Sequence, residues 1–318
     1  MGPGTLLLRA GLFGVLVLAV LACFYCFGPS VSPVDYLGAA RQKQERLKNL
    51  GSPKLVVIGG SNAAFGIESE ALEKALCKPV VNMGLHAALG FRYMTAEVVD
   101  QLGAGDLVIV ALEYSNFEKP DRMEDVLSVA IDRVPEALAF VPWYYRPKLL
   151  FGLAVWRMQA AWNAIVHRSA IFEESPIYNT RAFDERGDMV AHLAQPIPTE
   201  RKSEPEEFDT LYVDQSFWPI ASEFDERAKA VGARVLFSWP SVSRSMYRAL
   251  DSEAVRKAMQ AHGLTVIGSP GDYVFPEPMF FDTWYHLHSE GRSQRTALLL
   301  RDLCEAEPEL CCPSGESP

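Results

Sequence analysis

The feature that most constrains this chain is a single long apolar run near its N-terminus. Leu6–Phe27 is interrupted by one charged residue, Arg9, and no charged side chain occurs from Ala10 to Val34. About 20 apolar residues span a bilayer as a helix, and an arginine near the end of a span can extend to the membrane surface. We therefore expect residues 1–34 to form one transmembrane anchor, which excludes a multi-span membrane protein.

Arg9 also predicts the orientation of the anchor. Basic residues near a span favour the cytoplasmic side, and the next ones begin only at Arg41. A cytoplasmic N-terminus places the rest of the chain on the extracytoplasmic side. Two alternatives stay open, namely a lipoprotein processed at Cys23 and a cleaved signal peptide. Both also put the body of the chain outside the cytoplasm.

Beyond the anchor, short β-branched runs alternate with helical patterns. The expected strands are 54–59, 79–82, 106–112, 233–238 and 264–267, and the expected helices are 68–76, 89–102, 221–231, 244–261 and 289–304. This alternation predicts a parallel sheet with helices on both faces, that is, a three-layer α/β/α domain. Functional groups of such domains lie beyond the carboxyl ends of the strands.

These patterns divide the chain into one interrupted domain. Residues 35–53 are polar and helix-prone and are expected to form a stalk, and residues 306–318 a flexible tail. The α/β domain is expected to comprise residues 54–116 and 211–305. The 318 residues would accommodate two domains, but the motifs described below bracket only one.

The segment 117–210 breaks the alternation. It begins with an apolar and aromatic helical stretch at 135–167 and continues as a proline-rich polar stretch. We expect a helical insertion followed by a long loop. The insertion is most simply a helical cap packed on the core; a lid, a membrane-lying patch and a partner surface are the alternatives.

Charge and cysteine content bear on partners and compartment. The net charge of −10, with no run of Lys or Arg longer than a pair, argues against nucleic-acid binding. Four cysteines lie in the body of the chain, where an oxidising compartment permits disulfides. Cys311 and Cys312 can pair with Cys304 or Cys77, and the sequence does not decide between these pairings.

A serine directly after the first expected strand is the first candidate for chemistry. Gly59-Gly60-Ser61-Asn62 forms a tight strand-to-helix turn, which exposes a hydroxyl in the cleft at the strand end. A nucleophile needs this exposure, a nearby base and free backbone N–H groups. A serine that caps a helix would give the same local pattern.

Two further blocks complete a possible catalytic set. Asn82-Met83-Gly84 follows the second strand, and the glycine lets a backbone N–H approach an oxyanion. Near the last helix, His286 can act as the base for the serine, and Asp282 can orient its imidazole.

Metal and nucleotide sites are weaker interpretations. His288 and Glu290 lie close to Asp282 and His286, but the spacing is a poor zinc pattern, and we expect no metal and no cofactor. The glycine-rich stretch after the first strand lacks the lysine and the glycine spacing of a phosphate loop.

Together these blocks resemble the SGNH/GDSL hydrolase superfamily over roughly residues 54–116 and 215–303. Gly59-Gly60-Ser61 matches its nucleophile block, Asn82-Met83-Gly84 its Asn-x-Gly block, and Asp282, His286 and Gly291 its last block. The resemblance implies a flavodoxin-like three-layer fold and a catalytic triad of Ser61, His286 and Asp282. The sequence around the serine and histidine blocks is similar to that of membrane-anchored bacterial members, which work with membrane-bound O-acyltransferases on cell-surface polymers.

Three positions depart from the family pattern. Gly60 replaces an aspartate, and Asp282 lies one residue farther from His286 than in the common spacing. The third block should fall near residues 113–116, where Glu113 replaces a glycine and Asn116 is offset by one residue. The resemblance makes Asn116 the side-chain oxyanion donor, beside Gly84 and Asn82. Glu113 is either a pocket group that contacts substrate or His286, or a peripheral surface residue.

We therefore expect a serine esterase or O-acyltransferase on the periplasmic side of a bacterial inner membrane. Its substrate would be an ester-bearing cell-envelope glycan or a lipid-linked molecule, and a membrane-bound O-acyltransferase is an expected partner. The departures also motivate an alternative, a catalytically inactive binding or scaffold subunit of an envelope acylation complex.

Overall fold

Four of the five expected strands form one parallel sheet. The structure is a computed structural model that describes residues 3–29, 35–122, 125–167, 175–199, 212–247 and 252–312. The sheet contains β1 (Leu55–Gly59), β2 (Val80–Asn82), β3 (Leu107–Ala111) and β4 (Arg234–Phe237), in the order β2-β1-β3-β4.

The register of the sheet places its functional ends together. Val57 on β1 pairs with Asn82 on β2 and with Ile109 on β3, which in turn pairs with Leu236 on β4. The carboxyl ends of the strands therefore meet at one edge. The fifth expected strand is reduced to an isolated parallel bridge between Phe237 and Val266, and β5 (Val242–Ser243) pairs with β6 (Val274–Phe275) beside the main sheet.

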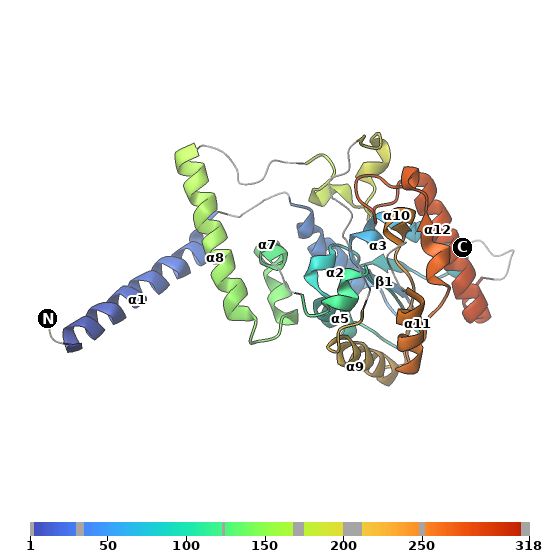
Figure 1. The fold of residues 1–318 in the computed structure, drawn as a ribbon, viewed down its shortest axis with the longest axis horizontal. Coiled ribbons are helices and arrows are strands. Elements are labelled where there is room, and N and C mark those ends of the chain that lie inside the picture. The colour runs from blue at the N-terminus through green and yellow to red at the C-terminus, as the bar shows by residue number, and fades with distance from the viewer. Residues whose placement is uncertain are drawn as a thin grey trace.

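Side chains of the central strands alternate between two apolar layers. Val56 and Ile58 of β1 face one layer, and Leu55 and Val57 face the other. The first layer is covered by α2 (Ala39–Asn49), α5 (Phe91–Val99), α9 (Phe217–Ala230) and α11 (Ser252–Ala261); the second by α3 (Ser61–Gly66), α4 (Ser69–Leu76) and α12 (Ser289–Ala306). Figure 1 shows these helices around the sheet, so the expected α/β architecture with a parallel sheet is confirmed.

Shorter helices connect these elements. The α-helical ones are α6 (Ser115–Glu118), α7 (Asp125–Arg133), α8 (Arg146–Trp162, continued as a π-helical turn through Asn163–His167) and α10 (Arg244–Tyr247). The 3₁₀ turns are η1 (Tyr36–Gly38), η2 (Ala87–Leu89), η3 (Pro135–Phe140), η5 (Thr180–Ala182), η6 (Ala191–Ala194), η7 (Pro270–Tyr273), η8 (Glu277–Met279) and η9 (Pro308–Leu310).

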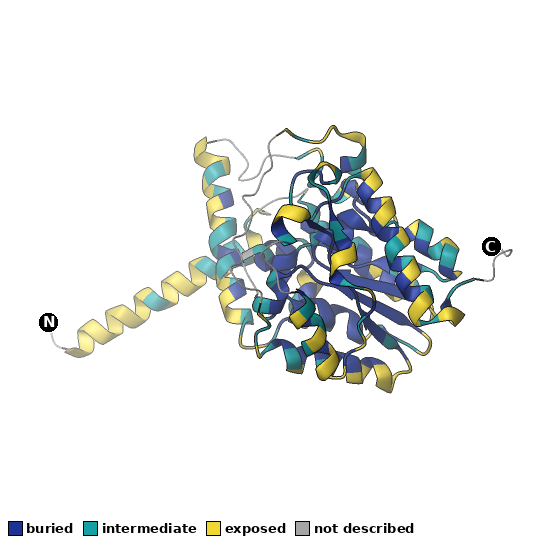
Figure 2. Ribbon diagram, turned by 45° about the vertical axis from the view of Figure 1, so that its right-hand side comes forward, coloured by how far each residue is buried: buried dark blue, intermediate teal, exposed yellow. Residues whose placement is uncertain are grey.

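The apolar run at the N-terminus forms the long helix α1 (Pro3–Phe27). Its mean hydropathy is 2.5 and it is long enough to cross a membrane. Figure 2 shows it exposed along nearly its whole length, projecting away from the domain. Arg146–His167 also meets the length and composition of a span, with a mean hydropathy of 1.2, although it is partly buried in the structure.

Residues 35–53 do not form the expected stalk. The helix α2 packs into the core, and Ala40 and Leu47 on it are at most 4% exposed. The reason is that α2 carries one buried face, with Lys43 and Gln44 between the two apolar positions. Its overall polarity concealed this face in the sequence.

The expected flexible tail is likewise attached to the domain as far as Cys312. Disulfides join Cys77 to Cys312 and Cys304 to Cys311, which resolves the pairing that the sequence left open. Leu310 is also buried, in the layer that contains α4 and α12. Residues 313–318 lie outside the described residues.

Candidate functional site

Ser61 lies where the sequence predicts it, at the junction of β1 and α3. The strand ends at Gly59, and Ser61 is the first residue of the helix. Its hydroxyl donates a hydrogen bond to Glu113 Oε1 over 3.0 Å, and the same oxygen accepts the backbone N–H of Asn62 at 2.9 Å. Glu113 is only 7% exposed, so it is not a peripheral surface residue.

Gly60 and Glu113, two of the departures from the family pattern, are linked in space. A Cβ added at Gly60 would lie 2.6 Å from Glu113 Oε1 and 2.9 Å from the Ala87 backbone. Real Cβ atoms do not approach other heavy atoms this closely. The Glu113 carboxylate thus occupies the space that a side chain at position 60 would need, and the backbone of η2 closes it further.

His286 and Asp282 form the second half of the site. His286 Nδ1 lies 2.8 Å from Asp282 Oδ1, and Asp282 is fully buried. Tyr178 donates its hydroxyl to the other oxygen, Oδ2, at 2.5 Å and lies 3.3 Å from His286 Nδ1. The long Asp–His spacing is therefore compatible with direct contact, since the intervening turn folds back through Thr283.

Burial and the Asp282 charge raise the pKa of Tyr178 far above its ordinary value. The phenol therefore remains protonated and donates to the carboxylate throughout the physiological range. A buried carboxylate with two hydrogen-bonding partners is well placed to hold the imidazole in one orientation and to stabilise its protonated form.

The two halves meet at helix α3. The His286 ring stacks on Phe65, with ring centroids 3.9 Å apart and planes 6° apart. Phe65 lies four residues after Ser61, and residues with this spacing share a helix face. Among the described residues, however, no hydrogen bond joins His286 to Ser61. The expected Ser–His hydrogen bond is not formed, because the serine hydroxyl is directed at Glu113.

Asn82 and Gly84 are in contact, but with each other rather than with the cleft. Asn82 Oδ1 accepts the Gly84 N–H at 2.9 Å, so this expected oxyanion donor is occupied. Asn82 Nδ2 donates to Ala63 O and to Asp188 Oδ1. The block therefore fixes the β2 end to α3 by hydrogen bonds.

Asn116 is also directed away from a substrate position. It is 1% exposed, and its Nδ2 donates to Ala87 O at 2.9 Å. Its Oδ1 has no partner among the described atoms. In this conformation Asn116 supports η2 and does not present its amide to an oxyanion, in contrast to the expectation from the resemblance.

Lys43 holds the backbone that follows β2, and the sequence did not predict this role. Its Nζ donates to Asn82 O at 2.8 Å, to Gly84 O at 2.7 Å and to Gly187 O. A lysine ammonium has three donors, which match these three carbonyl acceptors. Burial lowers the pKa of Lys43 to about 7. Its position in a polar, apparently solvated helix gave no sign of this role.

Three other charged residues hold the strand ends in place and were also missed. Asp188 accepts from the Ser69 hydroxyl at 2.6 Å and pairs with Arg292 at 2.7 Å. Arg295 donates to the backbone and side-chain oxygens of Asn62 at 2.6 and 2.9 Å. Both arginines are at most 5% exposed. Arg292 and Arg295 lie on the closing helix at positions where its period places apolar residues. This was the one sign in the sequence that they are buried.

The remaining histidines near the site make local contacts. His86 Nδ1 accepts the Ala88 N–H as the cap of η2, and His288 Nε2 lies 3.2 Å from Gln195 O. His192 is buried, and burial lowers its pKa to about 3, so it is neutral. Within the part of the chain that the structure describes, no three His, Cys, Asp or Glu side chains are grouped to hold a metal ion.

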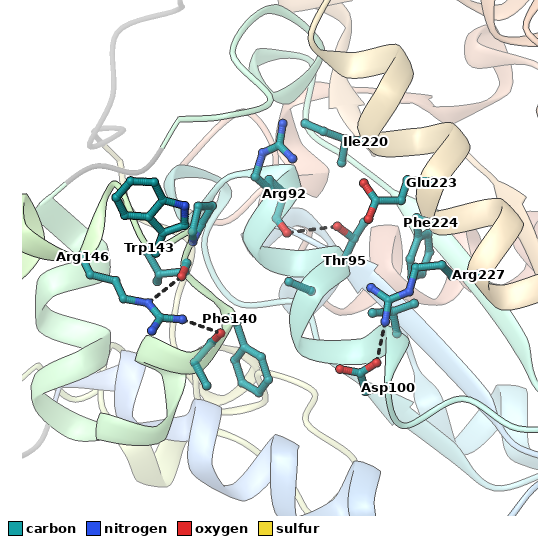
Figure 3. A pocket seen from close by; sticks show the side chains of 15 residues that line it. Arg92, Thr95, Asp100, Phe140, Trp143, Arg146, Ile220, Glu223, Phe224 and Arg227 are labelled. Atoms are coloured by element: carbon teal, nitrogen blue, oxygen red, sulfur yellow. Dashed lines mark hydrogen bonds and ion pairs between the residues drawn. The ribbon is translucent and has the colours of Figure 1, made fainter.

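A cavity of about 410 Å³ lies elsewhere, between α5, α9 and the segment that leads into α8 (Figure 3). Its arginines are engaged: Arg146 donates to Val141 O and Ala139 O, and Arg227 pairs with Asp100 at 2.6 Å. None of the candidate site residues lines this cavity.

Comparison with known proteins adds no assignment. No protein-family model matches this chain, and no curated protein matches it in sequence. The site is therefore interpreted from its geometry, which joins a serine on a strand-to-helix turn to a buried Asp–His–Tyr group through one short helix.

Proposed function

We propose that this chain is a membrane-anchored, SGNH-type serine esterase or O-acyltransferase. The observation that carries the proposal is the His286–Asp282 pair, 2.8 Å apart and supported by Tyr178, beside the helix that Ser61 begins. The strand order β2-β1-β3-β4 also supports a flavodoxin-like fold, in which groups at the strand ends form the site.

In the proposed reaction Ser61 Oγ attacks the ester carbonyl, and His286 Nε2 accepts the hydroxyl proton. His286 then returns the proton to the leaving alcohol, and the acyl group remains on Ser61 until water or a glycan hydroxyl takes it. Asp282 stabilises the imidazolium through Nδ1. This reaction requires the Ser61 hydroxyl to turn from Glu113 to His286 when substrate binds, with the Ser61 backbone N–H facing the oxyanion.

The proposed location is the periplasmic side of a bacterial inner membrane. Arg9 favours a cytoplasmic N-terminus, and the two disulfides of the body suit an oxidising compartment. Tethering favours a substrate that is itself attached to the envelope, such as a glycan or a lipid-linked acyl carrier. The resemblance described above makes a membrane-bound O-acyltransferase the proposed partner.

A second function, a catalytically inactive binding or scaffold subunit, is favoured by one set of contacts. The Ser61 hydroxyl is bonded to Glu113, and the Gly84 N–H is bonded to Asn82, so nucleophile and oxyanion donor are both engaged. Under this alternative the strand ends form a recognition surface in which Glu113 and Ser61 act as one polar group.

Covalent labelling of the full chain with a fluorophosphonate separates the two functions. An active serine is expected to react, and Ser61→Ala and His286→Ala are expected to lower the labelling rate by about 10⁴-fold or more. Glu113→Gln keeps an acceptor for the Ser61 hydroxyl and is expected to retain labelling within about tenfold, since His286 is the proposed base. An unreactive wild-type protein would contradict the enzyme and favour the binding subunit. Loss of labelling in Glu113→Gln alone would assign the base to Glu113.

A further inference from the structure

Helix α8 carries two apolar faces, of which only one is covered. Leu149, Leu153 and Ala160 lie on the face packed into the insertion and are at most 8% exposed. The other face has the same spacing of three and four residues, which places its members in one line along the helix. We call this line the apolar stripe; it consists of Phe151, Val155, Met158, Trp162 and Ile165.

The apolar stripe is open in the structure. Phe151, Met158, Trp162 and Ile165 are 58%, 38%, 61% and 79% exposed, and Val155 is half-buried. Single exposed apolar residues are ordinary, whereas a continuous line of large ones marks a contact with another apolar phase. On a helix whose other face is held by its own domain, such a line suits contact with the apolar part of a membrane.

The position of α8 beside the end of α1 indicates that the apolar stripe contacts the membrane. In Figures 1 and 2, α8 crosses the C-terminal end of α1, and the two helices are in extensive contact. On α1, Leu21, Phe24 and Tyr25 are half-buried there, whereas residues 15–20 are exposed. The contact therefore lies where a span of about 20 residues leaves the hydrocarbon core.

Arg157 fixes this junction. Its guanidinium donates to Tyr25 O, pairs with Asp132 over 2.7 Å and lies 5.8 Å from the centre of the Tyr25 ring. Arg157 is thus held between α1 and α7, since Asp132 belongs to α7 and its side chain is fully buried. The same ion pair ties α8 to the domain, which argues against α8 as a second span.

We propose that α8 is an interfacial membrane helix, whose apolar stripe is immersed in the outer boundary of the bilayer that α1 spans. This inference rests on the anchor of the proposed function but not on its chemistry. Trp162 supports it, because tryptophan is enriched at membrane–water interfaces. The consequence is that the domain is attached along a line rather than at one flexible point, so the orientation of its strand ends relative to the membrane is fixed.

Spin-label accessibility of the full chain in phosphatidylcholine–phosphatidylglycerol nanodiscs tests this inference. Cys23→Ser and Cys26→Ser remove the free thiols, and both disulfides are kept. Labels are then introduced singly by Met158→Cys and Ile165→Cys on the apolar stripe. Glu226→Cys, on an exposed position of α9, gives the aqueous reference, and Val15→Cys, in the middle of α1, gives the lipid reference.

Labels on the apolar stripe are expected to show an oxygen-to-nickel accessibility ratio several-fold above that at position 226 and below that at position 15, because the boundary of the bilayer is shallower than its centre. A ratio equal to that at position 226 would overturn the inference, because the stripe would lie in water. Low accessibility to both reagents would also overturn it and assign the stripe to contact with a second copy. If position 15 itself shows the aqueous ratio, the anchor of the proposed function fails as well; an aqueous stripe with position 15 in lipid refutes only the interfacial helix.

Discussion

The hydrogen bond from Tyr178 to Asp282 allows a sharp test of the site. Tyr178→Phe removes one hydroxyl and leaves the aromatic ring, so packing against Phe65 and Tyr36 is kept. Asp282 Oδ2 then loses a partner that lies at 2.5 Å, in a place where the carboxylate is fully buried. Hydrogen bonds to charged groups contribute about 1.5–3 kcal/mol to stability. We expect the midpoint of thermal unfolding to fall by about 2–5 °C.

The chain offers a matched control outside the Asp282–His286 pair. Tyr273 donates to Asp302 Oδ2 at 2.7 Å, and both residues are at most 3% exposed. Tyr273→Phe is expected to lower the unfolding midpoint by a similar amount. Both variants are measured by circular dichroism in one detergent. Stability alone therefore does not distinguish the two variants.

Reactivity does distinguish them. If Tyr178 holds Asp282 in the orientation that supports His286, Tyr178→Phe slows fluorophosphonate labelling of Ser61 by up to roughly 10- to 150-fold, which is the same 1.5–3 kcal/mol expressed as a rate. Tyr273→Phe is expected to label at the wild-type rate at a temperature where both variants are folded. Equal rates in the two variants would refute the role of Tyr178 as a positioning residue.

Three further predictions concern the support of the site. Gly60→Ala brings a Cβ within 2.6 Å of Glu113 Oε1 and is expected to lower the free energy of unfolding by about 1–3 kcal/mol in denaturant titration; an unchanged stability would contradict the described packing. Asp188→Ala leaves Arg292 buried without its carboxylate, and a loss of about 3–5 kcal/mol is expected, whereas a loss below about 1 kcal/mol would show that the pair is solvated. Burial raises the pKa of Glu97 from 4.5 to about 8, so the folded state holds a proton that the unfolded state has lost between these values. Stability should therefore fall as pH rises from 4.5 to 7, by at most about 1.4 kcal/mol per pH unit, and Glu97→Gln should flatten this slope; an equal slope in the variant would refute the assignment.

The sheet could be predicted from the sequence because its strands carry their own signal. Residues 54–59 and 106–112 are β-branched runs buried on both faces, and the structure places β1 and β3 there within one residue at each end. The weaker run at 264–267 became a single bridge at Val266, because pairing to β4 extends over only this position.

The parts that could not be predicted are those in which polar residues are buried. Lys43 and Arg295 occupy core positions because backbone carbonyls from distant segments surround them, and no local pattern records those carbonyls. Tyr178 reaches Asp282 across more than 100 positions of the chain, from a proline-rich stretch with no periodicity. Contacts of this kind depend on the path that the insertion takes over the domain. Secondary-structure propensities of its residues do not determine that path.

The departures from the family pattern show the same limit. Gly60 and Glu113 look like two independent losses in the sequence, yet the structure shows one compensated arrangement around Glu113 Oε1. The identities of candidate residues were accessible from strand-end positions. Their hydrogen-bond partners, which decide what each residue can do, were not.

Acyl transfer through Ser61 requires a covalent acyl-enzyme, which can be trapped and located. The full chain is incubated with p-nitrophenyl acetate, quenched in acid and mapped by peptide mass spectrometry. An acetyl group is expected on the peptide that contains Ser61, and it is expected to disappear in both Ser61→Ala and His286→Ala. Acetylation confined to surface lysines, with Ser61 unmodified in the wild-type chain, would contradict acyl transfer through Ser61.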